Sequence, residues 1–266
     1  MTDVGRDTLR SRWDERYRTF SLDESGCLGA GDRPNRLIYR VKKQALRRLL
    51  GSAGFDARRH FRVLDMGCGF GYFAAFYHAE FPAASYTGVD ISTRAIDRAK
   101  EMLPAGEFYA DDIVSWRHPT NVRFDVVQAI EVLQLIVDDG AFEAALGNFE
   151  RHLADGGVIL LPMAFSERKS ANEHQRFRPR PYFDRLIETL GLEVVAEKRL
   201  YYWLIDGGPT GRIARAIFSR LGPGLLYLVD RIAVAFGIQN HRPNHQLSTA
   251  HMLLIRRRQV VGGAAR

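Results

Sequence analysis

The sequence at positions 63–71 is Val-Leu-Asp-Met-Gly-Cys-Gly-Phe-Gly, an apolar run that leads directly into three glycines at alternate positions. The apolar run predicts a buried strand, and residues 72–80, which follow it, are predicted to form a helix. Glycines between a strand and a helix let the backbone approach a ligand closely, and they place the amides of the helix N-terminus beside it. This pattern predicts a binding site for a ligand of nucleotide type.

The residues around the glycines distinguish between two kinds of ligand. A dinucleotide cofactor needs a further glycine at position 72, where the chain has Tyr72, and its pyrophosphate would lie near the carboxylate of Asp65. A positively charged ligand suits this carboxylate better. S-adenosylmethionine (SAM) carries an ammonium and a sulfonium group and no phosphate, and is therefore the ligand that the loop favours.

Apolar runs and helical stretches alternate through residues 61–165. The predicted strands are residues 61–66, 85–91, 108–110, 124–130 and 158–165, and the predicted helices between them are 72–80, 93–103 and 141–153. Short apolar runs separated by helices indicate a parallel sheet that is covered on both faces. Farther on, we expect a polar loop at 167–181, a helix at 182–190, and strands at 192–205 and 252–257.

Acidic residues end or follow the second and third of these strands. Asp90 ends the run Tyr86-Thr87-Gly88-Val89-Asp90, where a carboxylate can accept hydrogen bonds from both hydroxyls of a ribose. Asp111 and Asp112 follow the next strand, where an acid can accept from an adenine amino group while Ile113 packs against the ring. Both positions fit the nucleoside part of SAM.

Four blocks, at residues 63–71, 86–92, 110–113 and 124–133, follow one another in the order and at the spacings of class I SAM-dependent methyltransferases. The chain resembles this family most clearly over residues 61–135. The resemblance implies a Rossmann-like, seven-stranded, mostly parallel sheet with helices on both faces, and SAM as the cofactor. We expect this domain at residues 61–258, with a helical cap at 1–60, a helical insertion before the last strand and a tail at 259–266.

The resemblance also implies roles for individual residues. The three glycines would form the loop under the methionine part of SAM, and Gln128 with Ala129 would line its methionine end. Asp90 matches the ribose acid and Asp112 with Ile113 the adenine pair, with Asp111 as an alternative to Asp112. The predicted cofactor-binding set is Trp13, Tyr17, Asp65, Gly67, Cys68, Gly69, Gly71, Asp90, Ile91, Asp111, Asp112, Ile113, Gln128 and Ala129.

The first 60 residues are basic, and residues 37–50 show helical spacing of apolar side chains. Trp13 and Tyr17 are four positions apart and can face one side of a helix. The surrounding sequence resembles the cap that many of these enzymes fold over SAM. The same pair could simply dock this helix on the domain, and the two interpretations are compatible.

The acceptor side departs from the family pattern. Many relatives that act on small molecules have Glu-His after the fourth block, whereas this chain has Gln134-Leu135, so no base can be assigned there. His174 is the candidate for a catalytic residue, with a solvated loop histidine as the alternative. Alignment of the acceptor with the methyl group can drive the transfer without a base. The candidates for acceptor binding are Arg176, Arg178, Tyr202, His241 and His245.

Residues 207–247 separate two strands that the family usually joins directly. Within this insertion, the positions Leu225, Leu228, Val229, Ile232 and Phe236 form an apolar stripe. Three roles compete for it: a lid over an apolar acceptor, a homodimer interface, or a peripheral contact with a membrane surface. We favour the lid.

Composition restricts the function further. The chain has 266 residues, a formal net charge of +7 and average apolar content, which exclude a disordered or fibrous protein. No apolar run of membrane-spanning length and no secretory signal are present, and two cysteines predict neither a disulfide framework nor a metal site, so we expect a cytoplasmic protein. The expected function is SAM-dependent methylation of a small or lipid-like acceptor at oxygen. An RNA or nucleobase methyltransferase and a non-catalytic scaffold are the alternatives, although no nucleic-acid partner is expected.

Overall fold

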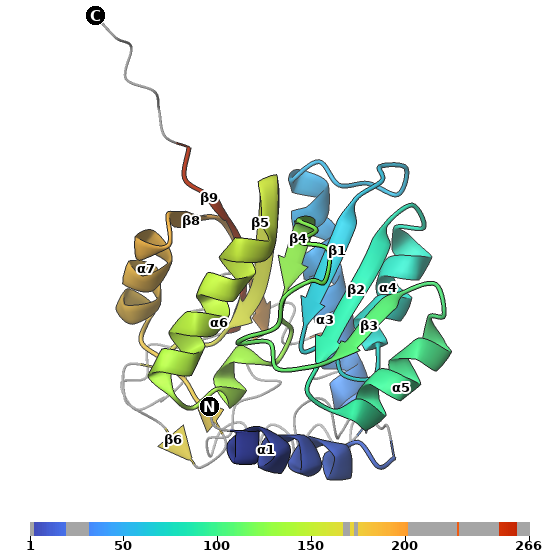
Figure 1. The fold of residues 1–266 in the computed structure, drawn as a ribbon. Coiled ribbons are helices and arrows are strands. Elements are labelled where there is room, and N and C mark those ends of the chain that lie inside the picture. Colours follow the sequence, from blue (N-terminus) through green and yellow to red (C-terminus); the bar gives the residue numbers. More distant parts are fainter. Residues whose placement is uncertain are drawn as a thin grey trace, which may run out of the picture.

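A computed structural model of the chain describes residues 3–19, 32–166, 171–172, 175–201, 228 and 250–259. Its centre is a seven-stranded sheet in the order β3-β2-β1-β4-β5-β9-β8 (Figure 1). The strands are β1 (Arg62–Met66), β2 (Ser85–Asp90), β3 (Glu107–Ala110), β4 (Phe124–Gln128), β5 (Leu153–Met163), β8 (Leu192–Tyr201) and β9 (Ala250–Arg257). Only β9 runs antiparallel to its neighbours, β5 and β8. The sheet is therefore mostly parallel, and this prediction is confirmed.

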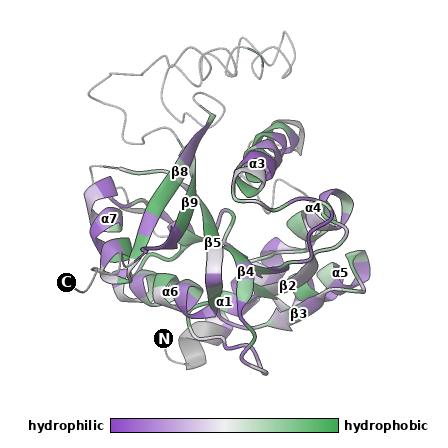
Figure 2. Ribbon diagram, turned by 90° about the horizontal axis from the view of Figure 1, so that it is seen from above, coloured by the Kyte–Doolittle hydropathy of each residue, from purple (hydrophilic) through white to green (hydrophobic). Residues whose placement is uncertain are grey.

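Helices cover both faces of the sheet. The helices are α1 (Asp3–Arg16), α3 (Asp32–Ser52), α4 (Tyr72–Glu80), α5 (Thr93–Met102), α6 (Asp139–His152) and α7 (Arg180–Thr189), with a short 3-10 helix, η1 (Leu133–Leu135). One hydrophobic cluster joins the sheet to α3, α4 and α5, and a second joins it to α6 and α7. Figure 2 shows α3 and α4 on one side of the strands and α6 on the other. Consecutive strand residues such as Val63 and Leu64 belong to different clusters, as expected for strands buried on both faces.

The register of the central strands brings their C-terminal ends together. Asp65 of β1 pairs with Gly88 of β2 on one side and with Gln128 of β4 on the other. Asp90 in turn pairs with Ala110 of β3. The loops after β1, β2, β3 and β4 therefore meet at one edge of the sheet, where ligands bind in open α/β folds. Helix α1 lies across this edge, below the sheet in Figure 1.

Several predicted boundaries were wrong, and β4 for example ends at Gln128 rather than at residue 130. Strand β5 begins at Leu153, directly after α6, because Leu153 pairs with Phe124 and Gly156 adopts a φ of 72°. The polar stretch 167–181 is not only a loop, because two short strands pair there, β6 (Ala171–Asn172) and β7 (Gln175–Arg176). Helix α7 then starts at Arg180, since Pro179 serves as its N-cap and the proline after Arg180 is tolerated in the first turn.

The predicted domain division remains a prediction. Helix α3, within the predicted cap, buries residues such as Leu46 and Leu49 in the same cluster as β1 and α4. The insertion at 207–247 lies outside the described residues except for Leu228, whose side chain is 54% exposed. Its suggested roles as a lid, dimer interface or membrane contact therefore stay predictions. Among the described residues, no helix has the length and apolar character needed to cross a membrane.

Candidate functional site

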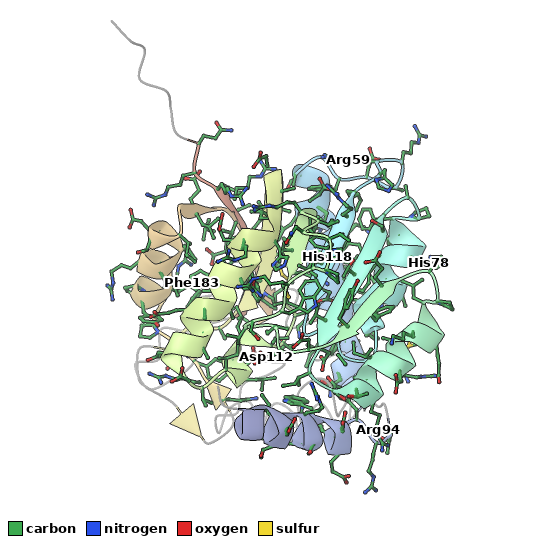
Figure 3. All side chains as sticks on the ribbon, viewed as in Figure 1. Arg59, His78, Arg94, Asp112, His118 and Phe183 are labelled. Atoms are coloured by element: carbon green, nitrogen blue, oxygen red, sulfur yellow. The ribbon has the colours of Figure 1, made fainter. Side chains whose placement is uncertain are left out.

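A cavity of about 740 Å³ opens at the C-terminal ends of β1, β2, β3 and β4, between α1 and the start of α6. In Figure 3, Asp112 lies between the strand ends and α1, where this cavity is. The lining includes many of the residues predicted to bind the cofactor: Trp13, Tyr17, Gly67, Cys68, Gly69, Asp90, Ile91, Asp112 and Ile113. The four sequence blocks therefore meet around one space.

The glycine loop forms the part of the wall that follows β1. The backbone amides of Gly67 and Cys68 both donate to the carbonyl of Val89, at 2.7 and 3.0 Å, and hold the turn against β2. Gly67 has a φ of 86°, and a Cβ there would lie 2.3 Å from Cγ2 of Val132. Gly69 has a φ of 53°, and its Cβ would lie 3.0 Å from the Tyr17 hydroxyl. At both positions glycine is favoured by the left-handed backbone conformation and also because a neighbouring side chain occupies the space of a Cβ.

Asp90 connects the end of β2 to the glycine loop. One carboxylate oxygen accepts a hydrogen bond from the amide of Gly69 at 2.9 Å, and the other accepts one from the amide of Ser92 at 2.9 Å. Burial raises the pKa of Asp90 to about 6 despite these two bonds. Each oxygen has a further lone pair, so the carboxylate can still accept from ribose hydroxyls.

The structure distinguishes between the two candidate acids after β3. Asp112 is buried, accepts a hydrogen bond from the amide of Val114 at 3.0 Å, and lines the cavity beside Ile113. Asp111 accepts from the amide of Asp112 at 2.7 Å and is not part of the lining. Asp112 is therefore the better placed of the two to meet an adenine.

Several predicted cofactor residues lie outside the cavity lining. Gly71 precedes α4, and Ala129 is buried. Asp65 and Gln128 lie beneath the glycine loop, where Tyr86 donates to the Asp65 carboxylate and Tyr77 donates to the Gln128 side-chain oxygen at 2.9 Å. Burial raises the pKa of Asp65 to about 6. Asp65 in β1 and Gln128 at the end of β4 are neighbours in the sheet. Both side chains are buried, so they belong to the packing of the sheet rather than to the cavity wall.

Helix α1 covers the cavity on the side away from the strand ends. The rings of Trp13 and Tyr17 line it, 5.8 Å apart between centroids, and Tyr17 packs edge-on against Phe70 of the glycine loop. Burial raises the pKa of the Tyr17 hydroxyl well above its usual value. The guanidinium of Arg10 donates to the carbonyl of Ile91 at 3.2 Å. The two aromatic residues thus face the cavity and dock the helix at the same time.

Arg176 and Arg178, which were predicted to bind the acceptor, are not among the residues that line the cavity. Both bind the carboxylate of Asp139, at 2.6 and 3.0 Å. Arg178 is 3% exposed and also donates to the carbonyls of Ile136 and Asp138, while Arg176 donates to that of Val137. They hold the segment before α6 in place. The other acceptor candidates are Tyr202, His241 and His245. They lie outside the described residues, as does the catalytic candidate His174.

Other parts of the wall had no prediction from the sequence. They come from the glycine loop, the segments after β3 and β4, the first turns of α6, and helices α1, α3 and α4. They are Thr8, Leu9, Arg12, Tyr39, Phe70, Tyr72, Phe73, Val114, Ser115, Ile130, Glu131, Val132, Leu135, Ile136, Val137, Asp138, Gly140, Ala141 and Ala144. Leu9 stands four positions before Trp13, and this helical spacing was a signal that the sequence offered. The segment after β4 follows a strand end, which is where sites form in such sheets.

Comparison with known proteins identifies a methyltransferase domain in this chain. Residues 64–159 match a family model described as a methyltransferase domain. The trans-aconitate 2-methyltransferase of Paracidovorax citrulli is 31% identical over 128 residues, covering 48% of this chain and 47% of that protein. Its counterpart from an Azoarcus species is 29% identical over 143 residues, covering 54% of each chain. This chain thus spans about half the length of the curated relatives it matches.

Solved structures share the fold at low identity. An O-methyltransferase from a trans-AT PKS multienzyme of Brevibacillus brevis, in complex with S-adenosyl-L-homocysteine, gives a TM-score of 0.56 at 12% identity, covering 85% of this chain and 79% of that one. The cyclase SpnF gives a TM-score of 0.56 at 17% identity, covering 81% and 80%. The matched residues 64–159, together with the strand order of the sheet, show that this chain contains a class I methyltransferase domain, the kind of domain that uses SAM as its cofactor.

Proposed function

We propose that this chain transfers the methyl group of SAM to a small or lipid-like acceptor, with oxygen as the favoured acceptor atom. The observation that supports this most strongly is the single cavity that gathers the glycine loop, Asp90 and Asp112 and extends past the end of β4. With a volume of about 740 Å³, this one cavity can contain both the nucleoside of SAM at the strand ends and an acceptor beside the segment after β4. The names of the curated relatives also support methyl transfer to a small molecule.

The reaction is a direct displacement. The acceptor oxygen attacks the methyl carbon, the carbon–sulfur bond breaks, and its electron pair stays on the sulfur of S-adenosylhomocysteine (SAH). The acceptor proton leaves to solvent or to a base. Helix α1 covers the cavity and restricts water, and the walls hold the two reactants in line, which can supply several kcal/mol.

The described walls favour an apolar acceptor. Beyond the strand ends they are formed mainly by aliphatic side chains: Ile130, Val132, Leu135, Ile136, Val137, Ala141 and Ala144. Trans-aconitate, named for the relatives, is a tricarboxylate that needs cationic partners. Among the described lining residues, one side chain is cationic, that of Arg12. Four are carboxylates, those of Asp90, Asp112, Glu131 and Asp138. We therefore favour an uncharged, apolar hydroxyl compound over a tricarboxylate.

Methyl transfer can be tested with SAM that carries tritium on its methyl group. The panel contains apolar alcohols and phenols, trans-aconitate, and transfer RNA, with Asp90→Ala as the inactive control. We expect label in the organic extract of samples with apolar hydroxyl compounds. Label confined to trans-aconitate would overturn the acceptor class, and label in RNA would favour the alternative enzyme. A wild-type protein that binds no SAM by calorimetry would refute the function altogether. The assay measures turnover directly, because the same fold also occurs in the cyclase SpnF.

A further inference from the structure

A buried ion pair joins helix α3 to the cavity wall after β4. Nζ of Lys42 lies 2.5 Å from Oε1 of Glu131, and the Lys42 side chain is 1% exposed. Glu131 lines the cavity and is 21% exposed. Its second carboxylate oxygen accepts a hydrogen bond from Nε2 of Gln134 at 3.0 Å. The acid is thus held from both sides while part of it faces the cavity.

The backbone at Glu131 is unusual. Its φ of 62° lies in the left-handed region, where a residue with a side chain is strained and persists only if its surroundings hold it. The next residue, Val132, presses against Gly67 so closely that no Cβ fits there. The contacts of Glu131 with Lys42 and Gln134 therefore fix the turn that packs on the glycine loop.

The order of the strands places Glu131 relative to the cofactor. Asp112 follows β3, Asp90 ends β2, and the glycine loop follows β1. The next strand in the sheet is β4, and Glu131 follows it. A SAM molecule with its adenine at Asp112 and its ribose at Asp90 would direct its sulfonium toward the β1 and β4 side. Glu131 and Asp138 are the carboxylates that the segment after β4 contributes to the described wall, and Glu131 is the one nearer to the strand end.

We propose that Lys42 and Glu131 are positioning residues that fix the turn after β4 and set the electrostatic potential at the sulfonium. Unpaired, Glu131 would attract the cationic sulfonium of SAM, and unpaired Lys42 would repel it. As a pair, their two opposite charges offset one another at this point of the wall. Because SAM is cationic at sulfur and SAH is neutral there, the pair also sets how strongly the protein prefers one over the other. This inference rests on the proposed function only for the role of SAH as product.

The test measures dissociation constants for SAM and for SAH by calorimetry and compares their ratio between variants. The two ligands share every other group, so the ratio isolates the charge at sulfur. In Lys42→Met, Glu131 stays partly hydrated, and we expect the preference to move toward SAM by about 3- to 10-fold. In Glu131→Gln, we expect a shift of similar size toward SAH. Lys42→Arg and the double variant Lys42→Met/Glu131→Gln should stay within about twofold of the wild-type ratio.

The matched control breaks another ion pair of the same helix. Arg47 of α3 pairs with Glu80 of α4 at the surface, far less buried than Lys42, and Arg47→Met should leave the ratio unchanged. A purely structural pair would lower the melting temperature, or both affinities equally, without shifts of opposite sign. An unchanged ratio in Lys42→Met and Glu131→Gln overturns the inference. Failure of the wild-type protein to bind either ligand refutes the proposed function instead, so the two failures are distinguishable.

Discussion

The carboxylate of Asp14 accepts a hydrogen bond from the hydroxyl of Ser92 at 2.6 Å, and this contact joins α1 to the strand end that carries Asp90. The same carboxylate oxygen accepts from the backbone amide of Arg94 at 3.1 Å. Ser92 also caps α5, because its hydroxyl oxygen accepts from the amide of Ala95. The helix that covers the cavity is therefore attached two residues away from the acid that we assign to the ribose.

This attachment predicts that Asp14 slows the release of the cofactor. Asp14→Ala removes two hydrogen bonds of about 1 kcal/mol each, so we expect SAH to dissociate about 10- to 30-fold faster. Stopped-flow displacement of SAH measures the rate. The control is Asp7→Ala on the same helix, because Asp7 is exposed and lies 3.9 Å from Arg10. Equal dissociation rates in wild-type and Asp14→Ala would contradict a covering role for α1.

Asp90 should make SAM binding depend on pH. Its pKa of about 6 lies above the usual aspartate value, so the carboxylate becomes ionised in the folded protein only as the pH rises through 6. The ionised form accepts ribose hydrogen bonds more strongly, so affinity for SAM should increase from pH 5 to pH 7. Asp90→Ala should weaken binding by about 30- to 150-fold at pH 7.5, from the loss of roughly 2–3 kcal/mol, and should flatten the profile. Calorimetry across this pH range provides the measurement.

The two acids after β3 offer a matched pair of variants. Asp112 lines the cavity and Asp111 does not, although they are neighbours of the same chemical type. We expect Asp112→Asn to reduce SAM affinity by about 5- to 10-fold through loss of a charge-assisted hydrogen bond to adenine, and Asp111→Asn to change it less than twofold. Inosine and adenosine forms of SAH separate an adenine contact from a general effect. The assignment fails if Asp111→Asn has the larger effect.

The sequence was informative where structure is local. The glycine loop and the helix at 72–80 were predicted with their exact bounds because glycine spacing and helical periodicity act within a few residues. The alternation of buried strands with helices predicted a parallel sheet, and the resemblance to the methyltransferase family implied that it has seven strands. Asp90 at a strand end was expected near the glycine loop, and its carboxylate accepts a hydrogen bond from the amide of Gly69. These are consequences of chain direction and strand order, which a sequence pattern specifies well.

Contacts between distant segments were not accessible in this way. Arg178 binds Asp139, 39 positions earlier, and nothing in its own neighbourhood indicates that partner. Lys42 lies in α3, before β1 in the sequence, whereas its partner Glu131 follows β4. The left-handed φ of Glu131 is also unexpected for a residue other than glycine. Asp65 and Gln128 were predicted as cofactor ligands at strand ends, and in the structure their side chains are buried and accept hydrogen bonds from Tyr86 and Tyr77.

Arg178 should contribute to stability rather than to acceptor charge recognition. Arg178→Met removes one partner of Asp139 and the hydrogen bonds to the carbonyls of Ile136 and Asp138, of which, among the described residues, only that of Asp138 keeps another donor, the amide of Phe142. We expect the free energy of unfolding to fall by about 2–3 kcal/mol. Urea unfolding measures this loss. The control is Arg258→Ala, which breaks an exposed pair with Glu188 and should cost less than about 1 kcal/mol. An Arg178→Met protein of wild-type stability would restore the earlier hypothesis of a ligand for an anionic acceptor.

Alanine substitutions at Gly67 and Gly156 distinguish the effect of backbone strain from the effect of close packing. Both have a φ above 70°, so alanine at either position costs about 1–2 kcal/mol through the left-handed conformation. At Gly156 a Cβ meets nothing within 4 Å, whereas at Gly67 it would lie 2.3 Å from Val132. We expect Gly156→Ala to bind SAH normally and Gly67→Ala to bind it at least 30-fold more weakly, because the loop must move away from Val132.

A second change identifies the obstruction. Shortening Val132 to alanine removes the methyl groups that a Cβ at position 67 would meet, so the double variant Gly67→Ala/Val132→Ala should recover most of the lost SAH affinity. It should not recover the stability lost to the left-handed backbone, which urea unfolding reports separately. Val132→Ala alone measures what the smaller side chain costs by itself. If the double variant binds SAH no better than Gly67→Ala, close packing against Val132 is not the reason that glycine is needed there.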